Sequence, residues 1–159
     1  MAATRAERIL SEAGITARVR TYEAASGDHN FGDEAVALTG LPAPKVFKTL
    51  VVDAAGELIF ALVPVAARLD LKVVARARGA KKARLAERTA AERATGYVMG
   101  GITAIGSTTA LPCFIDDSAR TQPTIIVSAG QRGRNLEVDP AALARLLDAQ
   151  FAPLAATGR

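Results

Sequence analysis

Two adjacent β-rich runs constrain the fold of this chain more than any other feature. Residues 46–52, VFKTLVV, and residues 57–65, ELIFALVPV, are joined by the short segment DAAG. Two such runs separated by a short turn containing Gly predict an antiparallel hairpin. Side chains alternate between the faces of a strand, so each residue of the first run can be assigned to a face. One face would carry Val46, Lys48, Leu50 and Val52, and the other Phe47, Thr49 and Val51.

Lys48 is the unexpected residue of this strand, because the rest of its face is apolar. A buried ammonium group loses its hydration, so it needs an anionic partner, a ring of carbonyls or a ligand. The alternative is that the lysine stem lies along the sheet while the ammonium group reaches water. We favour the first interpretation, in which Lys48 serves a binding or catalytic site.

Capping and periodicity predict helices in five other places. They begin after Thr4, near Gly32, after Asp70, in the segment ERTAAERAT and at Pro140 behind an Asp139 cap. The first four would end at Gly14, Gly40, Gly79 and Gly96, and the last would run to about Gln150.

Further strands are predicted from short runs of alternating or continuous apolar residues. These are ARVRTYE at 17–23, KKARLA at 81–86, the start of YVMGGITAIGS at 97–107, LPCFIDD at 111–117 and PTIIVSAG at 123–130. Strands and helices mix without strict βαβ alternation, so we expect an α/β fold with a mixed, barrel-like sheet flanked by helices. The length of 159 residues fits a single domain spanning residues 1–159.

Composition excludes several kinds of site. Cys113 is the single cysteine and His29 the single histidine, which rules out an intramolecular disulfide, a CxxC site and a multi-histidine metal site. A Ser-His or Cys-His catalytic arrangement would have to use His29, and Cys113 is expected to be a buried thiol. The chain has neither a signal-peptide pattern nor an apolar run of the ~20 residues that a membrane span needs. We therefore expect a soluble, cytoplasmic protein with no metal and no membrane partner.

Positive charge and glycine turns permit an anionic ligand without requiring one. The net charge is +4, and a basic cluster would lie either along a nucleic-acid backbone or on a solvated helix face and turn. Its members are Arg76, Arg78, Lys81, Lys82, Arg84 and Arg88. Glycines at 100, 101 and 130 lie beside predicted strands, where they would form tight turns or bring backbone N–H groups to a ligand. Their spacing matches neither a dinucleotide-binding nor a P-loop motif.

The chain resembles a known family in the order and content of its motifs. These motifs are TYE at 21–23, NFGDE at 30–34, VFKTLVV at 46–52, VPVAARLDLKVVARARGAKK at 63–82, TGYVMGGITAIG at 95–106 and VSAGQRG at 127–133. Together they resemble the YbaK/EbsC family, bacterial free-standing relatives of the editing domain of prolyl-tRNA synthetase. The resemblance implies that family's α/β fold, with a mixed, mainly antiparallel barrel-like sheet. It also implies an enzyme that hydrolyses a wrong amino acid from tRNA, chiefly Cys-tRNA(Pro) and secondarily Cys-tRNA(Cys).

The same resemblance implies roles for individual residues. Lys48 would bind and orient the terminal nucleotide or the ester, and the backbone of Gly100 and Gly101 would approach the ester carbonyl. The cysteine of the substrate would attack its own ester, so no protein nucleophile is required. The remaining substrate-binding positions would be Tyr22, Phe31, Thr49, Ile102, Ser128, Gly130 and Asn135.

Two positions depart from the family pattern and leave the amino-acid specificity open. Ala104 stands where the glycine loop commonly has proline, and Asn135 stands where an aspartate is common. Three hypotheses follow: a Cys-tRNA(Pro) deacylase, a deacylase for another amino acid such as alanine, and a non-catalytic RNA- or nucleotide-binding regulatory module. The expected partners are the 3′ end of aminoacyl-tRNA and prolyl-tRNA synthetase, and no cofactor is expected.

Overall fold

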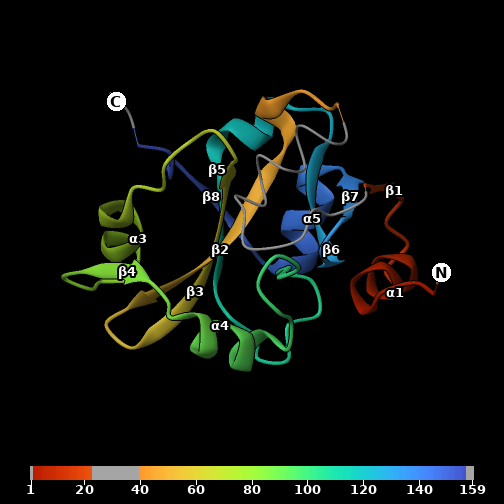
Figure 1. Cartoon of the computed structure of the whole chain (residues 1–159). Coiled ribbons are helices and arrows are strands. Elements are labelled where there is room, and N and C mark those ends of the chain that lie inside the picture. Colours follow the sequence, from red (N-terminus) through yellow and green to blue (C-terminus); the bar gives the residue numbers. More distant parts are fainter. Residues whose placement is uncertain (1, 23–39, 157–159) are drawn as a thin grey trace.

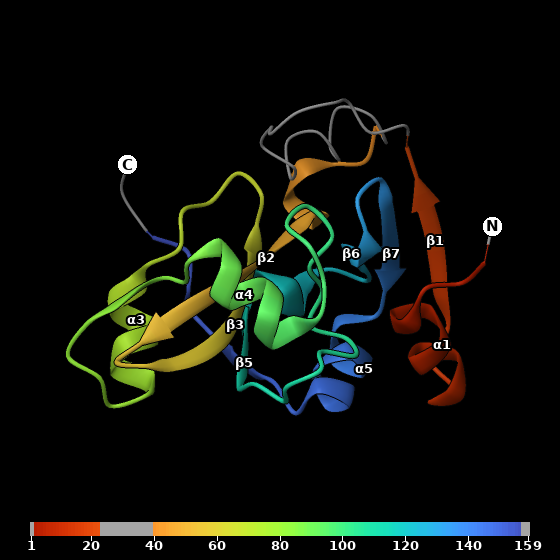
Figure 2. The ribbon, with the colours of Figure 1, turned by 60° about the horizontal axis from the view of Figure 1, so that its bottom comes forward.

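A computed structural model describes residues 2–22 and 40–156 (Figure 1). The predicted helix at 32–39 and the candidate site residue Phe31 lie outside the described residues. The strands form two sheets, one of three strands and one of five (Figures 1 and 2).

The five-stranded sheet is built on the predicted hairpin. Strand β2 (Phe47–Ala54) pairs antiparallel with β3 (Glu57–Pro64), and Lys48 lies opposite Val63. The two turn residues, Ala55 and Gly56, have φ angles of 55° and 93°, as a two-residue hairpin turn requires. The strand order is β4-β2-β3-β5-β8, with β4 (Ala83–Leu85) antiparallel and β5 (Cys113–Asp116) and β8 (Gln150–Ala152) parallel to their neighbours.

The three-stranded sheet is antiparallel and meets the larger sheet at a single described bridge. Its order is β1-β7-β6, with β1 at Ala17–Thr21, β7 at Arg134–Val138 and β6 at Ile125–Gln131. A parallel bridge joins Val46, just before β2, to Ile126 of β6. The mixed α/β architecture is confirmed, but the described strands form two sheets and not one closed barrel.

The main core lies between the two sheets. Phe60 and Leu62 of β3 face Val127 of β6 and Leu136 of β7 in one buried cluster, together with Leu10 of α1 (Arg5–Glu12). The alternate residues of β3, Ile59, Ala61 and Val63, belong to a second cluster beneath α3 (Leu71–Ala77). Both faces of β3 are therefore buried, which explains why its sequence is continuously apolar and not alternating.

The helices begin where the sequence predicts. Thr4, Asp70 and Asp139 cap α1, α3 and α5 (Pro140–Leu147) with their side-chain oxygens. Helix α4 (Arg88–Thr95) ends at Gly96, which has a φ of 80°. Two short 3₁₀ helices, Ala43–Lys45 and Asp117–Thr121, precede β2 and follow β5.

The structure corrects the sequence prediction at three places. Residues 97–112 form turns and loop with no strand entry, because Gly100 and Gly106 adopt φ angles of 94° and 77° that break an extended backbone. Helix α5 ends at Leu147, where Asp148 is left-handed, and Gln150 already belongs to β8. The strands β7 and β8 were not predicted.

Candidate functional site

Lys48 lies on a face of β2 whose floor is a small apolar cluster. This cluster consists of Val46, Val65 and Ile126, with Tyr22 and Leu41 packed against it. Since Lys48 is two residues beyond Val46, the two side chains point to the same side of the strand. Lys48 itself is partly buried. The predicted face is thus confirmed, and Tyr22 is brought beside it from a distant part of the chain.

Strand register carries Ser128 and Asn135 to this same face. In a parallel pair, bridged residues point to the same side, so Val46 and Ile126 share a face. Two residues further along each strand are Lys48 and Ser128, and Ser128 pairs directly with Asn135 of β7. Four predicted site residues, Tyr22, Lys48, Ser128 and Asn135, therefore lie on one side of the junction between the sheets.

Asn135 presents an unused hydrogen-bond donor on this face. Its side chain is only 9% exposed, yet its amide nitrogen Nδ2 has no hydrogen-bond partner among the described residues. Leaving a buried donor unpaired costs about 1–3 kcal/mol, so a bound water or ligand that accepts from this group would stabilise the protein. The neighbouring Ser128 hydroxyl accepts a hydrogen bond from the Gly130 N–H at 3.3 Å. A substrate oxygen is the kind of group that would satisfy the Asn135 amide.

The glycine-rich loop packs on the strand that carries Ser128. A Cβ on Gly101 would lie 3.0 Å from the backbone nitrogen of Arg132, and one on Gly130 would lie 2.8 Å from Cε1 of Tyr97. Both glycines therefore permit a contact between the loop and β6 that a larger residue would prevent. The Tyr97 hydroxyl donates to the Ile105 carbonyl at 2.7 Å, which ties together the two ends of the loop.

The structure assigns one glycine N–H to the protein itself. The Gly101 N–H donates to the Val98 carbonyl at 2.9 Å, closing a turn in which Gly100 has a φ of 94°. That N–H is therefore engaged in this conformation and does not point to a substrate carbonyl. Among the described residues, no acceptor is found for the Gly100 N–H, so it is the better candidate to approach the ester.

Thr49 and Ile102 are not brought to this face. Thr49 alternates with Lys48 and shares the side of Phe47 and Val51, which belong to the main core. Its hydroxyl is buried without a partner among the described residues. Ile102 is 7% exposed and packs in the same core. Contacts from these two side chains to a substrate on the Lys48 face would require another conformation.

A charged network that the sequence analysis did not single out lies on the same sheet face. Glu137 of β7 is two residues from Asn135, so the two side chains share a face. Its carboxylate binds Arg20 at 2.7 Å, Lys45 at 3.2 Å and the Thr124 hydroxyl at 2.6 Å. These hydrogen bonds, first that from Thr124 and then that from Arg20, lower the pKa of Glu137 to about 2. The network joins β1, β7 and the segment that leads into β2.

Glu137→Gln should make stability less dependent on acid pH. Because the folded pKa of Glu137 lies below its ordinary 4.5, the ionised group stabilises the fold above pH 4.5, and this contribution is lost as pH falls toward 2. The variant should lose about 2 kcal/mol of unfolding free energy at pH 7 and little at pH 2. Urea denaturation at both pH values measures this, with exposed Glu12→Gln as the control. An equal loss at both pH values would contradict the ionic explanation.

Among the described residues, the other chemically reactive groups give no second site. Burial raises the pKa of the Cys113 thiol to about 12, in agreement with the predicted buried thiol. Within residues 2–22 and 40–156, no three His, Cys, Asp or Glu side chains cluster in a way that would hold a metal ion. Over the same ranges, no helix has the length and apolar character needed to cross a membrane.

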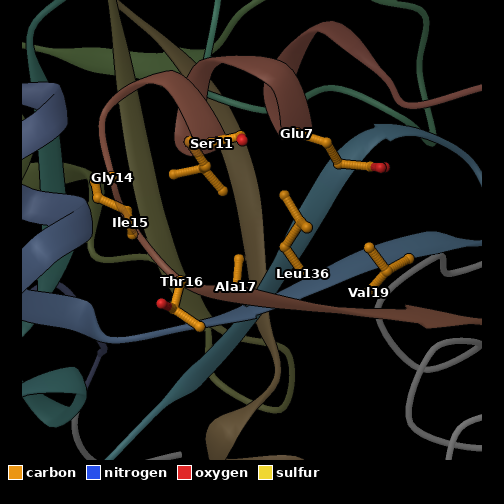
Figure 3. A pocket seen from close by; sticks show the side chains of 9 residues that line it. Glu7, Ser11, Gly14, Ile15, Thr16, Ala17, Val19 and Leu136 are labelled. Carbon is orange, nitrogen blue, oxygen red and sulfur yellow. The ribbon is translucent and has the colours of Figure 1, made fainter.

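A hollow of about 420 Å³ lies between α1 and β1 (Figure 3). Its lining includes Ser11 of the helix and Val19 of the strand, and the Leu136 side chain lies between the helix and β1. Leu136 faces the main core, so this hollow is on the opposite side of the three-stranded sheet from its neighbour Asn135. It contains none of the predicted site residues.

Comparisons with known proteins agree with this fold and these motifs. The family model of the aminoacyl-tRNA editing domain matches residues 31–146. A candidate Cys-tRNA(Pro)/Cys-tRNA(Cys) deacylase of Enterococcus faecalis, EbsC, is 36% identical over 138 residues, covering 85% of this chain and 84% of that protein. The chain therefore belongs to the aminoacyl-tRNA editing domain family, as its motifs predicted.

Two crystal structures are similar over nearly the whole chain. One is a candidate trans-editing enzyme for prolyl-tRNA synthetase, with a TM-score of 0.83 and 25% identity over 98% of this chain and 99% of that one. The other, a hypothetical protein, has a TM-score of 0.86 and 23% identity over 96% and 100% of the two chains, and it supports the fold alone.

Proposed function

We propose that this chain, as one domain spanning residues 1–159, is a trans-editing enzyme that hydrolyses the ester of Cys-tRNA(Pro), with Cys-tRNA(Cys) as a further substrate. The observation that carries the proposal is the convergence of Lys48, Ser128 and Asn135 on one face, with the Asn135 amide buried and unpaired. Family membership and the deacylase relative support the choice of reaction.

The proposed chemistry uses the substrate's own thiol as nucleophile. The cysteinyl sulfur attacks the carbonyl carbon of the ester, the bond from this carbon to the ribose oxygen breaks, and the thiol proton ends on that oxygen. Water then opens the resulting thiolactone. The protein binds and orients the substrate and stabilises the negative charge that develops on the carbonyl oxygen.

Each site residue has a proposed role in this step. The Lys48 ammonium binds the terminal nucleotide or the ester oxygen. The Asn135 amide donates a hydrogen bond to the substrate, and Tyr22 supplies an aromatic wall beside the apolar floor. Gly100 is proposed to direct its N–H to the ester carbonyl, with Gly101 and Gly130 allowing the loop to pack close to β6. Phe31, Thr49 and Ile102 remain predicted substrate contacts.

Specificity and partners complete the proposal. A site for proline cannot strongly exclude a cysteine of similar size, because small apolar differences are worth only ~1–3 kcal/mol, and a separate hydrolytic site restores fidelity. Docking to prolyl-tRNA synthetase would supply recognition of the tRNA body, and the trans-editing relative supports this. Ala104, which stands where the family commonly has proline, is buried in the main core at 7% exposure, and we propose that it affects specificity through the shape of the glycine loop.

The test is deacylation of Cys-tRNA(Pro), Ala-tRNA(Pro) and Pro-tRNA(Pro) by the purified protein, alone and with prolyl-tRNA synthetase. We expect release of cysteine and retention of proline. Release of alanine instead of cysteine would support the proposed site but show that its substrate is Ala-tRNA(Pro). Intact substrates in every reaction would overturn the enzyme assignment and favour an RNA-binding module.

Asn135→Leu should separate binding from stability. Replacing a buried, unpaired amide by an apolar side chain of similar size removes an unsatisfied donor, so the unfolding free energy should be unchanged or higher. A substrate hydrogen bond would be lost at the same time, which should reduce kcat/KM for Cys-tRNA(Pro) about tenfold. Thermal denaturation and steady-state kinetics measure the two effects. A variant that is stable and fully active would remove Asn135 from the proposed site.

A further inference from the structure

A second hollow, of about 820 Å³, lies at the other end of β2 from Lys48. It is formed by the β2–β3 turn, the loop after α3 and the start of β4. These three segments lie on the left side of Figure 1. We call it the basic groove, defined by its lining residues Asp53, Ala55, Gly56, Gly79, Ala80, Lys81, Lys82, Ala83 and Arg84.

The positive charges of this groove face solvent. Lys81, Lys82 and Arg84 are exposed. Arg84 has one long contact, 3.4 Å, to Asp53, and its side chain remains 71% exposed. Within the described part of the chain, neither Lys81 nor Lys82 has a carboxylate within ion-pair distance. Two uncompensated lysines and a weakly paired arginine beside one hollow create a local site for anions.

The groove and Lys48 are placed along one strand. From Lys48 to Asp53 is five residues of β2, a separation of about 17 Å along a strand. The side chains that follow Lys48 on its face, Leu50, Val52 and Ala54, pack with Val74 of α3. The loop that carries Lys81 and Lys82 continues from this same helix, while Asp53 and its partner Arg84 point to the opposite side of the sheet. The groove therefore lies at the end of β2, beyond α3, where the two sides of the sheet meet.

A short RNA strand is long enough to cover this separation. Successive phosphates in a stacked strand are about 3.4 Å apart along the axis, so about five nucleotides span 17 Å. An RNA whose 3′ end lies at Lys48 therefore has backbone phosphates within reach of the groove. Lysine and arginine contacts to phosphates position a nucleic acid without reading its sequence.

We infer that the basic groove binds the phosphate backbone of the substrate RNA about five nucleotides from its aminoacylated 3′ end. The inference rests on the proposed function, since it takes Lys48 as the place of that end. The groove would add affinity for the tRNA body, while the face around Lys48 acts on the ester. It also gives a function to Lys81, Lys82 and Arg84, three members of the basic cluster that the deacylation chemistry does not use.

The test compares the Lys81→Gln/Lys82→Gln variant with the wild-type protein. Binding of uncharged tRNA(Pro) is measured from 50 to 200 mM NaCl. Loss of two phosphate contacts should lower the slope of log affinity against log salt by about 1.4–1.8, and weaken binding on the order of tenfold at 50 mM. For Cys-tRNA(Pro), KM should rise while kcat is unchanged. Hydrolysis of the cysteinyl ester of a CCA trinucleotide, which is too short to reach the groove, should be unaffected.

The control removes two exposed arginines away from both the groove and the Lys48 face, Arg8 of α1 and Arg145 of α5, by substitution with glutamine. This variant loses the same two positive charges as the lysine variant. Its salt slope and KM should nevertheless stay close to those of the wild-type protein. An unchanged slope in the lysine variant, or an equal loss with the trinucleotide ester, would overturn the inference. If the wild-type protein hydrolyses neither substrate, the proposed function fails, while the binding measurement still decides whether the groove contacts RNA.

Discussion

Lys48→Met should reduce kcat/KM for Cys-tRNA(Pro) by about 10²-fold or more while leaving the fold intact. The methionine keeps the apolar stem that packs beside Val46 but removes the ammonium group. Loss of one preorganised group that stabilises developing charge typically costs 10²–10³ in rate. Binding of uncharged tRNA should fall much less, because the basic groove is unchanged. Deacylation kinetics, tRNA binding and thermal denaturation of the same preparations provide the three readouts.

Lys45→Met is the matched control for this substitution. Lys45 is also a lysine with a largely buried side chain, 18% exposed, and its ammonium group binds Glu137 and Thr124. Its loss should therefore lower the unfolding free energy by about 1–2 kcal/mol and leave turnover nearly unchanged. A Lys48 variant with wild-type turnover would disprove the proposed site. Equal losses of activity in both variants would show that the ion network, and not Lys48 itself, supports catalysis.

The hairpin at the centre of the fold was predictable because its signals are local. Alternation in β2, the β-rich run of β3 and the Gly-containing turn all lie within 20 residues. The caps at Thr4, Asp70 and Asp139 were predictable for the same reason, since each acts on backbone N–H groups within one turn. Alternation also placed Thr49 on the side opposite Lys48, so its partly buried position beside the core residues Phe47 and Val51 was already implied by the sequence.

The missed strands depend on partners that are distant in the sequence. Strand β8 has three residues and pairs with β5, more than 30 residues earlier, so its own sequence carries little signal. Strand β7 was hidden by the polar residues Arg134, Asn135 and Glu137. The alternation of Leu136 and Val138 behind the Gly133 turn was the available signal for it.

The candidate site was predicted in composition but not in arrangement. The family motifs predicted Lys48, Ser128 and Asn135 as site residues. Their side chains lie on one face because a bridge joins Val46 to Ile126. That register joins two sheets across 80 residues of chain, and nothing local in either strand specifies it. The hydrogen bond from the Gly101 N–H to the Val98 carbonyl was not predictable either, because this segment was predicted to begin a strand and instead forms a turn.

Gly130→Ala should destabilise the protein and impair deacylation together. Gly130 has a φ of 99°, and a Cβ there would lie 2.8 Å from Cε1 of Tyr97. Tyr97 cannot move aside at low cost, because its hydroxyl binds the Ile105 carbonyl and Arg5 lies 4.8 Å from the ring centroid. Overpacking of this kind costs about 1–3 kcal/mol beyond the backbone strain. Displacement of Tyr97 would also shift the glycine loop, so kcat/KM should fall with stability.

Gly79→Ala isolates the backbone contribution, since Gly79 has a φ of 69° but no atom within 4 Å of the added Cβ. Gly130→Ala should have a Tm lower than that of this control by about 2–4 °C per kcal/mol of overpacking in a chain of this size. Combining Gly130→Ala with Tyr97→Ala should cost less than the sum of the single substitutions, because the clash disappears. Additive losses of unfolding free energy in that double-mutant cycle would show that Tyr97 does not pack against Gly130. The glycine loop would then be held on β6 by other contacts.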